Sequence, residues 1–556
     1  MTSISCRAGV LAGVSAGAIS LGFVTPATAQ LTYFKPGDLV VSTVSGSTLD
    51  SASAIILNQY DLGAGGTTAT MNGSLTLPQT TNGANVGISG EYGSASEGIL
   101  QLSANGQYLT MMGYGVNPNT FNSSPIIGTP VVATSSKTTK GVTTYTTTTT
   151  TQYAYETTVA TATSTVSQPA APASATQALG QTTSLTNSTF TTVPRVAALI
   201  GTNGSVDTTT ALTGVFNTNN PRSVATVDGS SFYVSGQGVT GDGTGGVFYA
   251  LKGATTATAI NNGTTIPGGT GNGTGNATTG VPNPLFGTET RVVEIVNTGA
   301  GNSLQVSRDV GVSGTPNDAT DIRTLGTAGT LPTSAVTTAT TLIAGVVSSG
   351  LNTGSIDVTN ATDNGVNHPR NGQAIGHTGN TFVYLSPEEF FYANADTLYV
   401  ADSGSPKNGS GAAGLGEGGL QKWSLVGGTW TLDYDMVNGL SLVSQAGANS
   451  ATPTAAGVTG LFGLTGEVVG DQVELFATSY GLNELSPSYL YEITDSLSNT
   501  DYIAGDAETF TTLESAPAGT LFRGVSLAPA PEPASITVFG MGLLGAAVAR
   551  RRRARG

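Results

Sequence analysis

The body of the chain alternates short apolar runs, rich in Val, Tyr, Phe and Leu, with clusters of Gly, Asn, Asp and Ser. This spacing predicts many antiparallel strands joined by turns. A looser recurrence runs through it: an inner strand, a turn, a second strand that ends in small residues, and then a third strand. First and second strands are predicted in 98–115, 222–238, 291–311, 388–404 and 463–481, and third strands in 245–253, 419–428 and 488–496.

A single repeat of this kind cannot bury both faces of its sheet, so neighbouring repeats must stack on one another. Radial stacking of four-stranded sheets gives a β-propeller. The repeats begin near residues 98, 222, 291, 388, 463 and 522. We therefore predict an all-β fold, a single propeller of six four-stranded blades. The long interval 291–388 leaves room for a seventh.

The two ends of the body supply complementary parts of one blade. FRGVSLAP (522–529) begins a repeat, and no second or third strand follows it. GDLVVSTVSG (37–46) matches the second-strand pattern, and SAIILNQYDL (53–62) matches the third. We predict that the chain starts and ends within this blade, because joining the halves removes two exposed sheet edges.

A low-complexity segment interrupts the repeats at 133–192. It includes TTYTTTTTT (143–151) and has few large apolar side chains to offset the entropy lost on ordering. We expect a flexible excursion from one blade, and its threonines fit either O-glycosylation or a plain solvated loop. A second stretch rich in Gly, Asn and Thr, 261–280, is also expected to be a loop.

The N-terminus has the pattern of an export signal. An apolar run follows the first charged residue and ends before Ala27-Thr28-Ala29, which fits the A-x-A cleavage pattern. We expect residues 1–29 to form a signal helix. Sec-type export machinery and a signal peptidase, cutting after Ala29, would leave Gln30 as the new N-terminus.

The C-terminus combines three features in order. Pro531-Glu532-Pro533 comes first, and an apolar run of 14 residues, 536–549, follows it. A helix of that length is about 21 Å long, which is short for a hydrocarbon core of about 30 Å. A basic stop-transfer cluster then orients this end toward the cytoplasm. Its members are Arg550, Arg551, Arg552, Arg553 and Arg555. These features predict a short transmembrane anchor.

This order of features resembles the PEP-CTERM sorting signal of Gram-negative bacteria. The resemblance covers only residues 531–556. It implies that exosortase, a membrane protease-transpeptidase, recognises the Pro-Glu-Pro motif and removes the anchor. It also implies export connected with exopolysaccharide or biofilm, but no particular activity. The repeats are likewise similar to β-propeller-type PEP-CTERM proteins. The expected body is 30–530, and 531–556 is the sorting and anchor segment.

Charge and cysteine content exclude several functions. Of 556 residues only 10% are charged, with 19 basic and 34 acidic side chains. Six basic residues and one acidic residue lie in the terminal segments, so the body carries 13 basic and 33 acidic residues. No basic face remains to bind nucleic acid. Cys6 is the only cysteine and lies in the signal segment. The mature body therefore has no disulfide, no cysteine-ligated zinc and no thiol nucleophile.

Three local motifs match chemical signatures in form only. Gly241–Gly246 matches G-x-G-x-x-G, but a strand rather than a helix is predicted next, so we expect no dinucleotide cofactor. Gly13–Gly17 matches the nucleophile elbow but lies in the signal segment. The only histidines, His368 and His377, flank a loop signature, and we expect them at the surface rather than in a Ser-His-Asp triad.

The acidic residues suggest two further kinds of site. Glu388, Glu389 and Glu467 are candidates for the acid–base pair of a glycoside hydrolase, although adjacent residues of a strand point to opposite faces. Four aspartates in turns fit turn formation, with calcium binding as the less favoured alternative. They are Asp242, Asp396, Asp402 and Asp471. Trp423 and Trp430 are expected to pack within the blades.

We therefore expect an exported cell-surface or extracellular-matrix protein, without enzymatic activity, delivered by the exosortase route and associated with exopolysaccharide or biofilm. No catalytic, cofactor or metal-binding residue is assigned. The chain would be anchored transiently in the inner membrane by its C-terminal helix. The alternative is an extracellular hydrolase or lyase that acts on polysaccharide or lactones at the central channel.

Overall fold

We describe the protein through a computed structural model. The described residues are 34–46, 51–63, 65–122, 131–139, 142–152, 157–164, 193–217, 219–238, 243–261, 290–309, 320–344, 355–357, 382–404, 418–442, 457–481, 486–505 and 507–531. The predicted signal helix, both histidines, Asp242 and the tail beyond Pro531 lie outside them. No helix in the described part of the chain has the length and apolarity needed to cross a bilayer.

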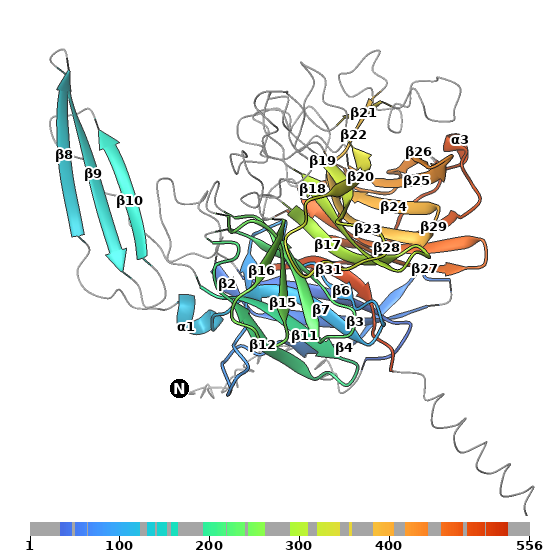
Figure 1. Ribbon diagram of the computed structural model, residues 1–556, viewed down its shortest axis with the longest axis horizontal. Helices are drawn as coiled ribbons and strands as arrows, with labels where there is room; N and C mark the ends of the chain where they lie inside the picture. Colours follow the sequence, from blue (N-terminus) through green and yellow to red (C-terminus); the bar gives the residue numbers. More distant parts are fainter. Residues whose placement is uncertain are drawn as a thin grey trace, which may run out of the picture.

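Six four-stranded antiparallel sheets form a propeller (Figure 1). From the inner strand outward, blade 1 is β31 (Thr520–Leu527), β1 (Leu39–Ser45), β3 (Ile55–Leu62) and β4 (Ala69–Thr76). Blade 2 is β6 (Gln101–Leu102), β7 (Tyr108–Tyr114), β11 (Arg195–Gly201) and β12 (Val206–Leu212). Blade 3 is β13 (Pro221–Ala225), β14 (Ser231–Gly236), β15 (Gly246–Leu251) and β16 (Thr258–Asn261).

The remaining three blades follow the same order. Blade 4 is β17 (Thr290–Asn297), β18 (Asn302–Asp309), β19 (Thr320–Leu325) and β20 (Ala339–Ala344). Blade 5 is β23 (Pro387–Asn394), β24 (Thr397–Asp402), β25 (Leu420–Val426) and β26 (Thr429–Met436). Blade 6 is β27 (Val458–Val469), β28 (Gln472–Gly481), β29 (Tyr489–Ser496) and β30 (Thr511–Ser515). The six predicted repeats are confirmed.

Smaller elements lie outside the blades. β2 (Ser51–Ser53) pairs with β5 (Gly90–Tyr92), and α1 (Pro118–Asn122) and α3 (Tyr502–Gly505) are single turns of helix. The interval that left room for a seventh blade contains, in its described part, only the two-stranded pair β21 (Ser355–Asp357) and β22 (Phe382–Tyr384) between β20 and β23. The propeller therefore has six blades.

The predicted closure of the ring is also confirmed. β31 pairs antiparallel with β1, with Leu39 opposite Leu527 and Thr43 opposite Phe522, and β1 pairs with β3 on its other side. The last strand of the described residues is thus the innermost strand of blade 1, and the first described strand lies next to it. No end of the ring is left as an unpaired inner edge.

Each junction between neighbouring blades has its own apolar cluster, because every strand presents apolar residues to the next blade. Trp423, 3% exposed, packs with Phe390 and Ile322 between blades 4 and 5, and Trp430 packs against the same cluster. This confirms the packing role expected for both tryptophans. The other five junctions are represented by Val40 with Val196, Val234 with Leu199, Tyr233 with Val306, Tyr399 with Leu475, and Val41 with Phe476.

A recurring hydroxyl hydrogen bond joins neighbouring blades. In four junctions a Ser or Thr of the second strand donates to a backbone carbonyl of the next inner strand: Ser42 to Gly98 at 2.7 Å, Ser235 to Arg291 at 2.9 Å, Ser307 to Glu388 at 2.6 Å, and Thr478 to Arg523. Thr110 makes a similar bond to Val224 between blades 2 and 3. At the junction of blades 5 and 6 the corresponding residue of β24 is Ala401, which has no hydroxyl.

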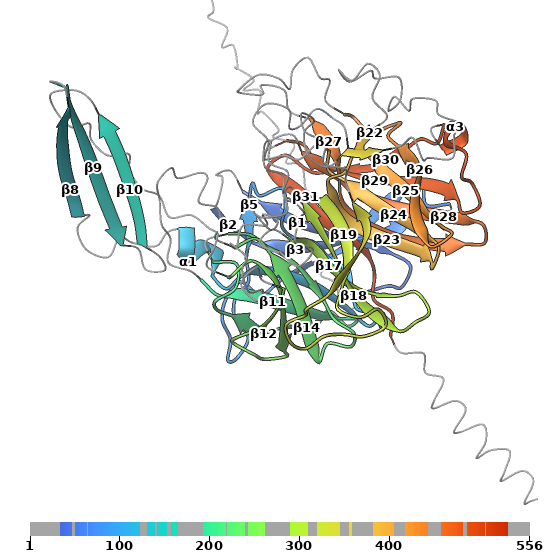
Figure 2. The same cartoon turned by 45° about the horizontal axis from the view of Figure 1, so that its top comes forward.

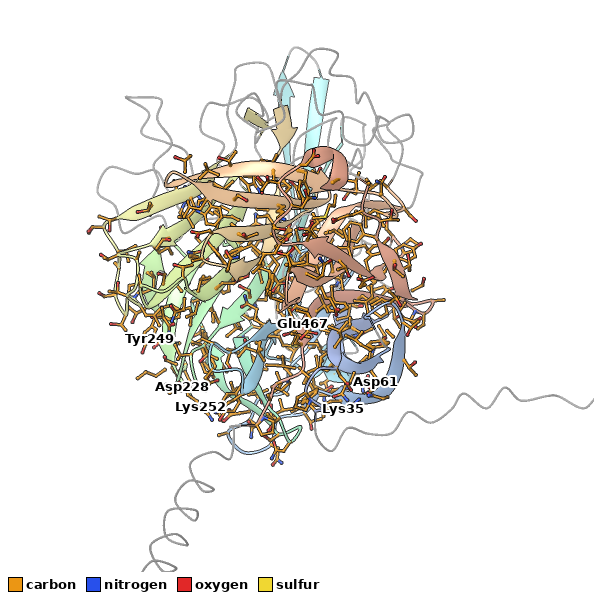
Figure 3. All side chains as sticks on the ribbon, turned by 90° about the vertical axis from the view of Figure 1, so that its right-hand side faces the viewer. Lys35, Asp61, Asp228, Tyr249, Lys252 and Glu467 are labelled. Atoms are coloured by element: carbon orange, nitrogen blue, oxygen red, sulfur yellow. The ribbon has the colours of Figure 1, made fainter. Side chains whose placement is uncertain are left out.

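The two faces of the disc differ in their connections. On one face, which we call the tail face, the blades turn within short segments such as 103–107, 227–230, 395–396 and 470–471. On the opposite loop face, β7 connects to β11 through 115–194, β16 to β17 through 262–289 and β20 to β23 through 345–386. Figure 3 looks onto the tail face, where Lys35 and Asp61, Asp228 and Lys252, and Glu467 are labelled.

Part of the Thr-rich segment differs from its prediction. It leaves blade 2 at the loop face between β7 and β11, as an excursion from one blade should. It contains a three-stranded antiparallel sheet of β8 (Val131–Thr139), β9 (Val142–Gln152) and β10 (Thr157–Ser164), set apart from the propeller in both Figure 1 and Figure 2. Threonine is β-branched and favours extended strands. A segment with too few large apolar residues for a core can therefore still form a sheet.

Candidate functional site

The centre of the propeller is filled by side chains rather than left as an open channel. Ile99, Val292 and Phe462 come from the inner segments of blades 2, 4 and 6, and they pack in one buried apolar cluster together with Tyr480. Beside them the Gln101 amide donates across the axis to the Val293 carbonyl at 3.0 Å. This plug separates the loop-face end of the axis from the tail-face end.

Close backbone approach explains why the inner strands of blades 1 and 2 carry glycine at this level. A Cβ atom on Gly524 would lie 2.2 Å from the Leu100 nitrogen, and the Gly524 amide donates to the Gly98 carbonyl at 3.0 Å. Gly98 itself has a φ of +83°, which side-chain-bearing residues rarely adopt. Glycine at these two positions therefore allows the backbones of blades 1 and 2 to come this close.

Below the plug, a cavity of about 210 Å³ opens at the tail-face end of the axis. It is lined by residues from the inner strands of all six blades, or from the residues directly after them. Two of the lining residues are acidic, Glu294 on β17 and Glu389 on β23, and among the described residues that line it there is no Lys or Arg. This cavity is the candidate functional site.

The two carboxyl groups accept hydrogen bonds from the backbone of the next blade. The Phe390 amide donates to Glu294, and the Leu464 amide donates to Glu389 Oε2 at 2.7 Å. Burial raises the pKa of Glu294 to about 8. Burial, and then the neighbouring Glu294, raises the pKa of Glu389 well above its usual range. Burial therefore favours the protonated form of both groups, because no cation among the described lining residues favours the charged form.

The loop-face end of the axis has the opposite electrostatic character. Arg291 Nη1 lies 3.5 Å from Glu388 Oε1, and the two side chains are 4% and 1% exposed. Glu97 accepts a hydrogen bond from the Tyr114 hydroxyl, and Arg195 stacks over the Tyr114 ring at 4.5 Å. Burial raises the pKa of Glu97 to about 7, opposed by that hydrogen bond and by nearby arginines. Carboxyl groups are matched with guanidinium groups at this end.

The structure separates the three glutamates that the sequence grouped. Glu389 lines the cavity, Glu388 points away from it to Arg291, and Glu467 lies opposite Glu474 in blade 6 rather than in the cavity lining. The predicted opposite orientation of Glu388 and Glu389 is confirmed. The partner of Glu389 is Glu294, which sequence reasoning missed.

A signal for Glu294 exists in the repeats. Aligning the inner strands on Arg222, Arg291, Glu388 and Arg523 places Glu294 at a position that Ala225, Phe391 and Ser526 occupy in other blades. An acidic residue there is out of pattern, and this could have marked the site.

The predicted turn aspartates do not gather into a site. Asp396 and Asp471 lie in tail-face turns of blades 5 and 6, and Asp471 accepts hydrogen bonds from Ser496 and Ser498. Asp402 is buried at the other end of β24 and accepts from Gln421 at 2.7 Å. Within the described ranges, no group of three or more acidic or histidine side chains could hold a metal ion. Strand β15 follows the glycine motif, as predicted.

The chain leaves the propeller next to the cavity. Ser526 and Leu527 of β31 line the cavity. Beyond the strand, the Ala528 amide donates to the Asp38 carbonyl at 2.8 Å, and the Ala530 amide donates to the Gly106 carbonyl at 2.9 Å. Pro531 follows directly and is exposed. The Pro-Glu-Pro sequence thus begins where the chain is released from the tail face.

Comparison with known families bears on this tail. A family described as the PEP-CTERM protein-sorting motif matches residues 529–553. The chain carries a PEP-CTERM sorting motif. This motif implies processing by exosortase and export as a surface protein that is anchored transiently in the membrane. The signal cleavage residues, Ala27 and Ala29, and the arginine cluster lie outside the described residues.

The rest of the PEP-CTERM chain has only distant counterparts. No curated protein matches it significantly. Among solved structures, an ancestral GH74 enzyme aligns with 81% of this chain at 10% identity and a TM-score of 0.30. The alignment covers 56% of that enzyme's own chain, so this chain spans little more than half its length.

Proposed function

We propose that the protein is a non-enzymatic surface or matrix component that is exported through Sec-type machinery, processed by signal peptidase and exosortase, and associated with extracellular polysaccharide or biofilm. The observation that carries this proposal is the plug of Ile99, Val292 and Phe462. The plug closes the axis between the faces. In this proposal the loop face is the side of the disc that contacts a matrix.

The orientation of the tail supports display of that surface. The residues just before the sorting motif are hydrogen-bonded to the tail face through Ala528 and Ala530. While the C-terminal segment is in the membrane, the tail face is therefore directed toward the bilayer. The loop face is directed away from it, toward the matrix.

One observation favours the alternative, a hydrolase or lyase that acts on polysaccharide or lactones. Glu294 and Glu389 face one cavity, and burial favours the protonated form of both. A protonated carboxyl with a raised pKa is the form that a general acid needs. Acid–base catalysis also needs a second group in the basic form, and the cavity lining offers no cation to hold a carboxylate ionised.

One experiment separates the two functions. Purified mature protein is assayed for retention on polysaccharide and for turnover of polysaccharide and lactone substrates, beside the variants Glu294→Gln, Glu389→Gln and the control Glu467→Gln. We expect retention without turnover, unchanged in all three variants. Turnover that falls by about 10²-fold or more in the two cavity variants but not in the control would establish the enzyme instead.

A further inference from the structure

A second buried charge cluster joins blades 5 and 6, away from the axis. Lys422 lies on β25, the third strand of blade 5, and Asp495 lies near the end of β29, the third strand of blade 6. Lys422 Nζ is 2.8 Å from Asp495 Oδ2, and both side chains are fully buried. The amine and the carboxyl group that would react are thus held next to each other before any reaction, which removes the entropy cost of bringing them together.

Aromatic residues enclose the pair. The hydroxyl groups of Tyr399 and Tyr434 donate to the two oxygens of Asp495, the latter at 2.6 Å. Lys422 Nζ lies 5.7 Å and 5.2 Å from the centres of the same two rings. Tyr491 belongs to the apolar cluster around them. The hydroxyl donors are placed where charge would develop on the carboxyl oxygens during attack at the carbon.

A second carboxyl group completes the arrangement. Glu508, in the segment that connects β29 to β30, is hydrogen-bonded to Asp495. Burial, followed by the charge of Asp495, raises the pKa of Glu508 to about 8. Its Oε2 atom is buried and makes no hydrogen bond. A carboxyl group that can gain or lose a proton near neutral pH therefore touches the Lys–Asp pair.

We propose that Lys422 and Asp495 condense to form an intramolecular amide bond, with Glu508 relaying the protons. In the neutral form of the pair, the Nζ lone pair attacks Cγ of Asp495 and forms the C–N bond. Glu508 accepts one proton from Nζ and returns one to the departing carboxyl oxygen, and the C–O bond breaks as water leaves. The amine and the carboxylic acid become one amide and one water, and Glu508 is regenerated, so no oxidant or other reagent is needed.

The surroundings suit the product as well as the reactants. The amide keeps one N–H on Nζ, and the Ser496 and Asn499 carbonyls both lie 2.7 Å from that atom. The new bond would link blades 5 and 6. At this junction Ala401 stands where the other junctions have a Ser or Thr that hydrogen-bonds to the next blade. A body without cysteine has no disulfide to perform this role.

The test is the mass of the intact, unfolded full-length protein, followed by peptide mapping. We expect a mass lower than the sequence mass of the same processed form by one water molecule, and a branched peptide that joins Lys422 to Asp495. Glu508→Gln leaves both reacting groups in place and should abolish the link. Lys422→Arg keeps the charge but cannot form the amide.

The chain provides an internal control. Lys252 Nζ lies 2.8 Å from Asp207 Oδ2, the same separation, but this pair is exposed and has no second carboxyl group among its described hydrogen-bonding partners. It should stay unlinked. The proposal would be overturned by a wild-type protein that melts cooperatively and has the full mass calculated from its sequence, with no loss of water. A link that forms unchanged in Glu508→Gln would also overturn it.

Discussion

The two ends of the propeller axis use the same residue types for opposite results. Toward the loop face, Glu388 lies against Arg291, and carboxyl groups are matched by buried arginines. Toward the tail face, Glu294 and Glu389 share a cavity with no lysine or arginine among its described lining residues. At the first end nearby arginines oppose the effect of burial on Glu97, and at the second no described lining residue opposes it.

The difference shows that burial alone does not decide the charge of a carboxyl group. Asp321 in blade 4 is as deeply buried as Glu389, yet two neighbouring arginines, Arg308 and Arg323, overcome the cost of burial and hold its pKa well below the usual range. Glu389 has only backbone amides and another acid nearby, and burial prevails. The two groups differ because Arg308 and Arg323 act on Asp321, whereas no arginine is among the groups that act on Glu389.

The largest effect should come from opening the ring that holds both ends in place. Deleting residues 30–62 removes β1 and β3, so β31 loses the strand beside it and β4 loses its ladder. We expect the cooperative thermal transition to disappear, measured by circular dichroism. A melt equal to that of the intact body would show that blade 1 does not close the ring.

The next largest effect should come from Asp321 on β19, the buried carboxyl group whose pKa two arginines lower. Arg308 binds both oxygens of Asp321, at 2.8 Å and 2.7 Å, and Arg323 adds further bonds. Asp321→Ala leaves two buried guanidinium groups unmatched, and we expect a loss of about 3–5 kcal/mol in the free energy of unfolding by urea titration.

Asp207→Ala is the matched control for that variant. It breaks an exposed pair with Lys252, with side chains 29% and 44% exposed, and should cost no more than about 1 kcal/mol. Equal losses in the two variants would contradict the proposed role of the arginines.

A smaller, pH-dependent effect should mark the tail-face end of the axis. The pKa of Glu294 rises from 4.5 to about 8 on folding. The stability linked to its proton is therefore fully present below pH 4.5 and is lost as the pH rises through 8. Glu294→Gln removes this loss. Between pH 5 and 9 the free energy of unfolding should therefore fall by roughly 2–4 kcal/mol less in the variant than in the wild type.

The control for the pH experiment is Glu467→Gln, which changes an acid outside the cavity. Urea titrations at several pH values should give this variant the same slope as the wild type. If Glu294→Gln also keeps the wild-type slope, Glu294 is ionised in the folded protein, and the contrast between the two ends is lost.

The smallest effect should come from the loop face. Shortening the connection 262–289 by half changes the entropy of loop closure by only about 0.6 kcal/mol, and we expect no measurable loss of stability. This variant is also the control for the deletion of 30–62, because it shortens a connection between blades and leaves all blade strands in place. A large loss here would mean that the connection forms part of the folded core.

Much of the fold could be predicted from the sequence because repeats are a local signal. The predicted strand pairs 222–238 and 463–481 begin and end close to β13–β14 and β27–β28. The closure of the ring by 37–46 could be predicted because the last repeat lacks a second strand of its own. The sheet in the Thr-rich segment was missed, because composition reports the lack of a core but not the strand preference of threonine.

The candidate site was harder to predict. Glu389 was chosen correctly, but Glu294 lies almost a hundred residues away and reaches the same cavity only because the ring places blades 4 and 5 side by side. The Lys422–Asp495 contact has the same origin. Charge matching between blades depends on which strand faces which, and no single repeat contains that information.

The place of β31 also has a consequence for the order of events during secretion. A chain that crosses a membrane from its N-terminus delivers β1 first and β31 last. β1 therefore lacks its inner neighbour, β31, until almost the whole body has crossed the membrane. Since Leu527 lies only four residues before Pro531, the disc can be completed only when the sorting sequence itself arrives at the outer surface. The strand that completes blade 1 and the sorting sequence thus emerge almost together, and a chain truncated before residue 520 would lack the inner strand of blade 1.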